Sequence, residues 1–271
     1  MIKSPLRYPG GKSKAVKFLS TIIKDCDSFF EPFAGGASLG IYISQVFNVP
    51  VYLNDINYDL YCFWKSALFN NEELETKVIN YYNMPKTKEV YFKIIEKNFD
   101  NEIDIGARFF ALNRITFSGT IESGGYSNQA HKKRFTESSI SRMKEVKTLK
   151  KISISNLDYQ DFLNNSFSEK SYVFLDPPYY SATKSALYGK NGELHKNFSH
   201  ETLFNFLLKN KDKFKFFMTY DNCDYIKNLY KKYFYIYEWK LQYGMTNKKT
   251  ESNNELLISN FEVNNDYFKK I

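Results

Sequence analysis

The stretch Ser171-Tyr172-Val173-Phe174-Leu175-Asp176-Pro177-Pro178-Tyr179-Tyr180 decides the fold predicted for this chain. Its first half is apolar, aromatic and β-branched, which is typical of a strand buried on both faces of a parallel sheet. Pro177 and Pro178 end that strand, because a proline lacks the N–H that a sheet requires and fixes its own φ. The sequence therefore predicts an α/β protein in which Asp176 stands on a stiff corner at the carboxyl edge of the sheet, where open α/β sheets bind ligands.

The residues of this corner suit a planar amine. The Asp176 carboxylate and the Pro177 carbonyl can accept the two N–H bonds of such an amine, and Tyr179 can stack on its ring. A strand that ends in a proline turn with a solvated aspartate explains the same residues equally well. This stretch alone leaves both interpretations open.

Length and composition limit the class of protein. The 271 residues can form one large domain or a core with an insert, and the formal net charge of +8 favours a polyanionic partner. Cys26, Cys62 and Cys223 are scattered and form no C-x-x-C pair, which indicates a reducing compartment and argues against a zinc site. The N-terminus does not resemble a signal peptide, and no apolar run approaches membrane-spanning length. We therefore expect a cytoplasmic protein that uses neither a metal nor a membrane.

Two glycine-containing turns stand near the N-terminus. Tyr8-Pro9-Gly10-Gly11-Lys12 precedes a helical pattern and can hold an anion through its N–H groups and lysine, although an ordinary turn before a helix explains it too. A predicted strand at 29–33 leads to the Gly35-Gly36 turn, which lets the backbone approach a ligand closely. A second predicted strand at 51–54 ends at Asp55, at the spacing where Rossmann-like folds place a carboxylate on ribose hydroxyls. Together, the glycine turn and the spaced acid predict a nucleoside site.

Four motifs in this order resemble those of the Dam-type (α-group) DNA adenine-N6 methyltransferases. They are Tyr8-Pro9-Gly10-Gly11-Lys12, Glu31-Pro32-Phe33-Ala34-Gly35-Gly36, Asn54-Asp55-Ile56-Asn57 and Asp176-Pro177-Pro178-Tyr179. Residues 253–260 resemble the last strand of that family, so the similarity covers essentially the whole chain. The resemblance implies a class I methyltransferase fold, Rossmann-like, with a mostly parallel seven-stranded sheet and an antiparallel C-terminal hairpin. It also implies a catalytic domain made of residues 1–60 and 150–271, interrupted by a target-recognition domain at 61–149.

The cofactor that the resemblance implies is S-adenosylmethionine. By this similarity its contacts are, from the methionine end to the adenine, Tyr8, Lys12, Asp176, Phe33, Ala34, Gly35, Asp55, Asp158 and Tyr159. Asp55 is the position expected to hold the ribose hydroxyls. The motif around Asp158, at residues 152–161, is the loosest of the set.

The insert is expected to be mainly helical and to contact the DNA. Apolar periodicity predicts helices at 72–82, 88–98 and 105–114, followed by a loop at 116–136 rich in Gly, Ser and Asn. Within it, Lys133-Arg134-Phe135 matches the hairpin of the family's target-recognition loop. The residues expected to bind DNA are Arg114, Phe117, Ser118, Thr120, Glu122, Asn128, Lys132, Lys133 and Arg134.

Two features of this loop restrict the prediction. Ser118 and Glu122 stand where members that read GATC carry Asn and Arg, so GATC is not assigned. A solvated basic surface is the alternative explanation for Lys132, Lys133 and Arg134.

The remainder of the chain is expected to complete the α/β core. Residues 181–198 have little periodicity and are expected to act as a lid over a bound base. Helices are predicted from Ser199 onward and at 225–233, strands at 214–220, 235–241 and 256–261, and a hairpin tip at 247–254.

The expected function is methyl transfer to the N6 amino group of an adenine flipped out of double-stranded DNA. Asp176 and the Pro177 carbonyl would accept from N6 and stabilise the charge that develops there, Pro178 would stiffen the corner, and Tyr179 would stack on the base. Such an enzyme acts alone or beside a cognate restriction endonuclease.

Three alternatives stay open. An RNA or protein amide methyltransferase uses the same Asp-Pro-Pro-Tyr site, although the large insert and the early Gly-Gly-Lys loop favour DNA. A catalytically inactive DNA-binding relative is disfavoured by the intact motifs, and a dehydrogenase does not explain the acid-proline-proline-tyrosine run. Cytosine-C5 methylation needs a cysteine nucleophile, normally after proline, and no cysteine of this chain follows a proline.

Overall fold

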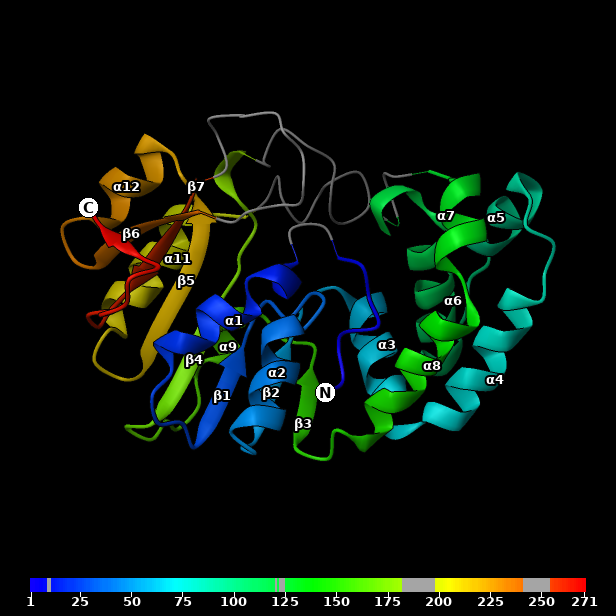
Figure 1. Ribbon diagram of the computed structural model, residues 1–271, viewed down its shortest axis with the longest axis horizontal. Helices are drawn as coiled ribbons and strands as arrows, with labels where there is room; N and C mark the ends of the chain where they lie inside the picture. The colour runs from blue at the N-terminus through cyan, green and yellow to red at the C-terminus, as the bar shows by residue number, and fades with distance from the viewer. Residues whose placement is uncertain (9–10, 120, 122–124, 182–197, 241–253) are drawn as a thin grey trace.

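One eight-stranded sheet organises the protein. The computed structural model describes residues 1–8, 11–119, 121, 125–181, 198–240 and 254–271. The parallel strands are β1 (Ser28–Glu31), β2 (Val51–Asn54), β3 (Ile152–Ser155), β4 (Ser171–Leu175) and β5 (Lys215–Asp221). The antiparallel strands are β6 (Tyr235–Lys240), β7 (Asn254–Ser259) and β8 (Lys269–Lys270). Their order across the sheet is β3-β2-β1-β4-β5-β7-β6-β8 (Figure 1).

This topology confirms the predicted class I arrangement of a mostly parallel sheet with antiparallel strands at the C-terminal end. β7 lies between β5 and β6, where Ile258 is opposite both Met218 and Ile236. The prediction of seven strands omitted β8, because two residues are too few to show a period-two pattern. The expected hairpin tip at 247–254 lies outside the described residues, apart from Asn254 at the start of β7.

Alternate side chains of the strands enter two hydrophobic cores, one on each face of the sheet. Phe29 of β1 and Phe174 of β4 belong to one core, whereas their neighbours Phe30 and Val173 belong to the other. Successive side chains of a strand point to opposite faces, so a strand covered on both sides needs a continuous apolar run. All five residues of β4 are buried, as that run predicts.

Helices cover both faces of the sheet. One core includes residues of α1 (Val16–Leu19), α2 (Ser38–Val46) and α3 (Tyr58–Phe69). The other includes residues of α9 (Tyr159–Phe162), α11 (His200–Lys209) and α12 (Asp224–Tyr230). Short 3-10 helices are η1 (Lys12–Lys14), η2 (Ser20–Ile22), η3 (Phe117–Gly119) and η4 (Val146–Thr148).

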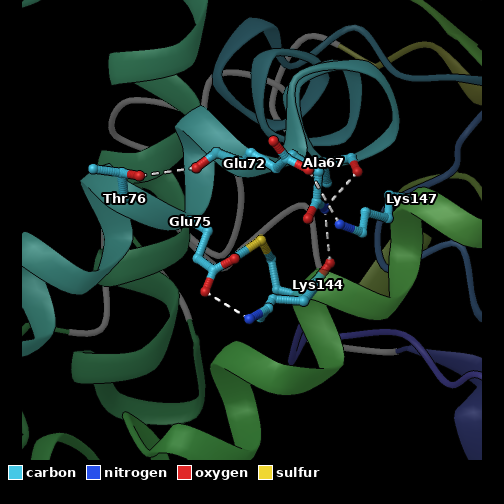
Figure 2. Close-up of polar contacts among 8 residues, drawn as sticks. Ala67, Glu72, Glu75, Thr76, Lys144 and Lys147 are labelled. Atoms are coloured by element: carbon cyan, nitrogen blue, oxygen red, sulfur yellow. Dashed lines mark hydrogen bonds and ion pairs between the residues drawn. The ribbon is translucent and has the colours of Figure 1, made fainter.

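A group of helices lies at the opposite end of the molecule from β5–β8 (Figure 1). It consists of α4 (Asn71–Tyr82), α5 (Lys88–Ile95), α6 (Glu102–Ile115), α7 (Asn128–Arg134) and α8 (Glu137–Glu145). Figure 2 shows how the chain after α7 returns to α4: Lys144 pairs with Glu75 at 2.7 Å and Lys147 with Glu72 at 3.5 Å. The buried Asn71 side chain also donates to the Met143 carbonyl at 3.2 Å, and this buried contact fixes α8 more firmly than exposed ion pairs do.

The prediction of a hairpin at Lys133-Arg134-Phe135 was wrong. The two basic residues end α7, which begins at the Ser127 cap, where the Ser127 side chain accepts from the Ala130 amide at 3.2 Å. Phe135 follows the helix and is fully buried. A capped helix followed by the buried Phe135 therefore stands where the hairpin was predicted. Between α6 and α8, the β pairing among the described residues is a single isolated bridge between Thr116 and Tyr126.

Candidate active site

Three carboxylates meet at the carboxyl edge of the parallel strands. Glu31 ends β1, Asp55 follows β2, and Asp176 follows β4. Because β1 pairs with both β2 and β4, these residues stand on three adjacent strands. The chain builds β2 and β3 on one side of β1, then β4 and β5 on the other, so the carboxylates lie at the topological switch point where α/β sheets bind ligands.

Asp176 is held by two side chains from distant parts of the sequence. The Lys12 ammonium lies 2.8 Å from Asp176 Oδ1 and 3.1 Å from Oδ2. The Thr219 hydroxyl, on β5, donates to Oδ1 at 2.7 Å. The Lys12 side chain is 4% exposed and that of Asp176 is 21% exposed, so this ion pair is largely shielded from water.

The far end of the proline corner is also fixed. The amides of Tyr180 and Ser181 donate to the Asp221 carboxylate at 3.0 and 2.8 Å. The corner between these two anchors is the stiff segment that Pro177 and Pro178 predict, so the orientation of Asp176 is set before any ligand binds.

Tyr179 faces the same group of charges. Its hydroxyl donates to Glu255 Oε2 at 3.1 Å, and the Lys12 ammonium lies 4.9 Å from the centre of its ring. Burial, with added repulsion from Asp176 and Glu255, raises the pKa of Tyr179 well above its usual value. The phenol therefore stays neutral and acts as a hydrogen-bond donor.

The glycine turn, Tyr8 and Asp55 form one compact unit. Gly35 has φ +46°, and a Cβ added there would lie 2.9 Å from the Tyr8 ring, so only glycine fits. Its amide and that of Asn57 donate to the two oxygens of Asp55 at 2.9 and 3.0 Å. Burial raises the pKa of Asp55, whereas these two hydrogen bonds lower it. The effect of burial is larger, and the resulting pKa is about 6.

Glu31 is a buried acid behind this unit. The amide of Gly40 in α2 donates to Glu31 Oε2 at 3.1 Å. Burial raises the pKa of Glu31 well above its usual value, and the charges of Asp176 and Asp55 raise it further. We conclude that Glu31 lies in the interior of the same site, close enough to both carboxylates to feel their charge.

The remaining residues expected to bind the cofactor lie beside β1 and β3. The rings of Phe33 and Tyr159 are 5.4 Å apart, and the Ala34 amide donates to the Asn54 carbonyl at 2.9 Å. Asp158 is exposed and caps α9, where its side chain accepts from the Gln160 amide at 2.8 Å. These contacts continue the carboxyl edge of the sheet from Asp55 toward α9.

The prediction that Arg114 contacts DNA was wrong. This residue of α6 is 3% exposed, and its guanidinium donates to the Pro5 carbonyl and to Asn113 Oδ1. Asn113 in turn holds the Arg7 backbone, donating to its carbonyl at 2.7 Å and accepting from its amide at 3.1 Å. The end of α6 faces the N-terminal segment, so these polar side chains hold the chain that leads to Tyr8 and are not available to a nucleic acid.

Other residues expected to bind DNA remain accessible. Phe117 is 64% exposed, and Asn128, Lys132 and Lys133 of α7 are exposed. Arg134 is partly buried, and Ser118 lies in η3. Thr120, Glu122 and the expected lid, except for its end residues 181 and 198, lie outside the described residues.

Three residues of the site were not predicted from the sequence. Glu31 precedes Pro32 as Asp176 precedes Pro177, and this similarity was a usable signal. Glu255 opens the apolar run of the last predicted strand, which is a weak signal, and Thr219 has none. Both are brought to Asp176 by the pairing of β5 with β4 and β7.

Metal-binding and membrane-spanning proteins carry features that the described parts of this chain lack. No group of three or more His, Cys, Asp or Glu residues there could hold a metal ion. Nor is any helix there long and apolar enough to cross a bilayer.

Known proteins are similar in sequence to nearly the whole of this chain. The Type II methyltransferase M.CviBI of Paramecium bursaria Chlorella virus NC1A is 26% identical over 272 residues, which cover 96% of this chain and 100% of that protein. The modification methylase StsI of Streptococcus sanguinis is 25% identical over 289 residues, covering 97% of this chain and 43% of that longer protein. The family model described as D12 class N6 adenine-specific DNA methyltransferase matches residues 8–245, from Tyr8 through the Asp176 corner to β6. The chain therefore belongs to the D12 class N6 adenine-specific DNA methyltransferases.

Proposed function

We propose that this protein methylates N6 of a flipped adenine in double-stranded DNA with S-adenosylmethionine as donor, and that Asp176 receives the adenine amine. The observation that carries the proposal is the position of Asp176, on a rigid corner one strand away from the Gly35 turn and two strands away from Asp55. An exocyclic amine and a nucleoside cofactor can thus be held side by side at one edge of the sheet.

The described residues fit the cofactor. Gly35 lets the Tyr8 ring pack directly against the turn, and the Asp55 carboxylate, which accepts one amide on each oxygen, has lone pairs left for ribose hydroxyls. We propose that Tyr8, Lys12 and Asp176 border the methionine end, Phe33, Ala34 and Gly35 the middle, and Asp55, Asp158 and Tyr159 the ribose and adenine. When bound, the cofactor supplies an electrophilic methyl group on a sulfonium.

The protein's own residues act on the amine. The N6 lone pair is delocalised into the adenine ring, so the amine is a poor nucleophile. Hydrogen bonds from N6 to Asp176 and to the Pro177 carbonyl favour a pyramidal nitrogen and stabilise its developing positive charge. Pro178 keeps that carbonyl in place, and Tyr179 stacks on the flipped base.

The helical insert is proposed as the part that contacts DNA. Residues 61–149 include Phe117, Asn128, Lys132 and Lys133, which are exposed, and Arg134, which is partly so. Ser118, Thr120 and Glu122 complete the proposed set, and GATC is not proposed as the recognition sequence.

Relatives named as a Type II methyltransferase and a modification methylase support a role beside a restriction endonuclease. The free thiols Cys26, Cys62 and Cys223 support a cytoplasmic location.

Replacement of the acid tests the catalytic role. Asp176→Asn keeps the size of the side chain and an acceptor for Thr219 but removes the negative charge, so we expect methyl transfer to fall at least about a hundredfold. Cofactor affinity measured by calorimetry should change by less than about fivefold. Turnover near that of the wild type would contradict the assignment.

The substrate is tested separately with the wild-type protein. Incubation with a labelled methyl donor and DNA, RNA or protein should label DNA. Modification-sensitive sequencing of DNA from cells that express the protein should then find N6-methyladenine in one sequence context. Label in RNA or protein alone would contradict the proposal.

A further inference from the structure

The Lys12 ammonium occupies the place that the proposed function gives to the adenine amine. It contacts both oxygens of Asp176, at 2.8 and 3.1 Å, and lies 4.9 Å from the centre of the Tyr179 ring. A base whose amine binds Asp176 while its ring stacks on Tyr179 needs the same two partners. The ammonium must therefore give up at least one Asp176 oxygen when the base binds.

A second carboxylate lies within reach of this ammonium. Glu255 Oε2 is 3.9 Å from Lys12 Nζ, and its side chain is 14% exposed. Glu255 lies opposite Asp221 in the β5–β7 pair. Asp221 is the residue that anchors the far end of the proline corner. Because Tyr179 donates to the same Oε2 oxygen at 3.1 Å, Glu255 is held in a fixed position beside Lys12.

The formal charges of Lys12, Asp176 and Glu255 decide whether the site can stabilise a positive charge on N6. Lys12 and Asp176 together are neutral, so a tight pair cannot offset the positive charge that develops on N6. With Glu255 included, the three groups carry one net negative charge. A buried ammonium also needs a carboxylate partner, because an unpaired charge in the interior is strongly unfavourable.

We propose that Glu255 is a positioning residue that takes the Lys12 ammonium from Asp176 when the adenine amine binds. The inference rests on the proposed function of Asp176 and deepens it. Two carboxylates share one cation: Asp176 holds it while the site is empty, and Glu255 holds it while Asp176 serves the amine. Lys12 has the four-carbon flexible stem that such a short movement requires.

Three substitutions test this role by single-turnover methylation of DNA at saturating cofactor. Glu255→Gln keeps an acceptor for the Tyr179 hydroxyl and removes only the charge, so we expect the rate to fall ten- to a hundredfold. Glu255→Asp retains the charge and should recover most of that loss. Glu238→Gln is the matched control, since Glu238 lies on β6, the strand beside β7, and pairs with Lys227 of α12 at 3.0 Å, and its rate should equal the wild-type rate.

A double-mutant cycle with Lys12→Met separates positioning from a structural effect. If Glu255 acts through Lys12, Glu255→Gln should change the rate less than about threefold in the Lys12→Met background. Equal factors in both backgrounds, or a Glu255→Gln rate within twofold of the wild type, would overturn the proposal.

Cofactor affinity gives a readout that does not depend on turnover. By calorimetry without DNA, Glu255→Gln should bind the cofactor within about twofold of the wild type, and a loss equal to the loss in rate would also overturn the proposal. A wild-type protein that fails to methylate DNA adenine would contradict the proposed function itself. The two failures are thereby distinguished.

Discussion

At the scale of single residues, Asp55 shows how one carboxylate serves the fold and the proposed cofactor site together. It accepts from the amides of Gly35 and Asn57, which fixes the glycine turn against the end of β2. Burial raises its pKa to about 6 from an ordinary value of 3.8. The folded protein thus holds this proton more tightly than the unfolded chain, so the contribution of Asp55 to stability falls as the pH rises from 3.8 through about 6.

Cofactor binding should show the opposite dependence on pH. The carboxylate accepts hydrogen bonds from ribose hydroxyls more strongly than its protonated form does, so we expect affinity to be constant above pH 7 and to weaken up to tenfold per pH unit below about 6. Calorimetric titration between pH 5 and 8 measures this. Asp55→Asn should bind weakly with a flat profile over that range, whereas a flat wild-type profile would refute the role given to Asp55.

At the scale of elements, α6 packs against α3, and α3 in turn belongs to the hydrophobic core on one face of the sheet. Gly106 makes this packing possible, because a Cβ at that position would lie 2.8 Å from the Cys62 carbonyl oxygen and 2.9 Å from the Phe63 Cα. Both neighbours belong to the backbone of α3, so neither helix can yield locally. The end of α6 then holds the segment before Tyr8 through Asn113 and Arg114.

Gly106→Ala should therefore destabilise the protein although alanine favours helices. Overpacking costs about 1–3 kcal/mol and offsets the gain in helix propensity, which is about 1 kcal/mol, so we expect a net loss of up to about 2 kcal/mol in the free energy of unfolding. Denaturant titration measures it. Asn80→Ala, on an exposed part of α4, introduces the same residue and should be neutral or stabilising by a few tenths of a kcal/mol. A Gly106→Ala protein as stable as that control would show that the helices can separate freely.

At the scale of the whole molecule, four arginines from distant parts of the chain, Arg7, Arg114, Arg134 and Arg142, lie close enough to act on one another. Burial lowers the pKa of Arg7, and repulsion by the charge of Arg134 lowers it further. Burial lowers the pKa of Arg114 to about 9, and the charges of Arg142, Arg7 and Arg134 add to this. With Lys132 and Lys133 exposed on α7 nearby, the helical end of the protein is the side expected to attract a polyanion.

The salt dependence of DNA binding tests this expectation. Each phosphate contact removed lowers the slope of log Kd against log salt by about 0.9, so Lys132→Gln combined with Lys133→Gln should lower it by about 2. Fluorescence anisotropy with a duplex measures the slope. The pair Lys209→Gln and Lys211→Gln, at the end of α11 on the sheet domain, should leave it unchanged. Equal slopes in the two double variants would show that α7 does not contact the backbone of DNA.

The sequence by itself determined the elements whose cause is local. The apolar run and prolines around Asp176, the turn at Gly35 and the strand that ends at Asp55 each depend on patterns within a few neighbouring residues, and the α/β sheet followed from them. Only the tertiary structure decided which distant side chains meet. Lys12 and Asp176 are 164 positions apart, Arg114 is turned inward by the N-terminal segment, and Lys133 and Arg134 end a helix whose following residue, Phe135, fills the core. Such contacts depend on how whole elements pack, because burial and pairing energies are set by neighbours in space and not by neighbours in the chain.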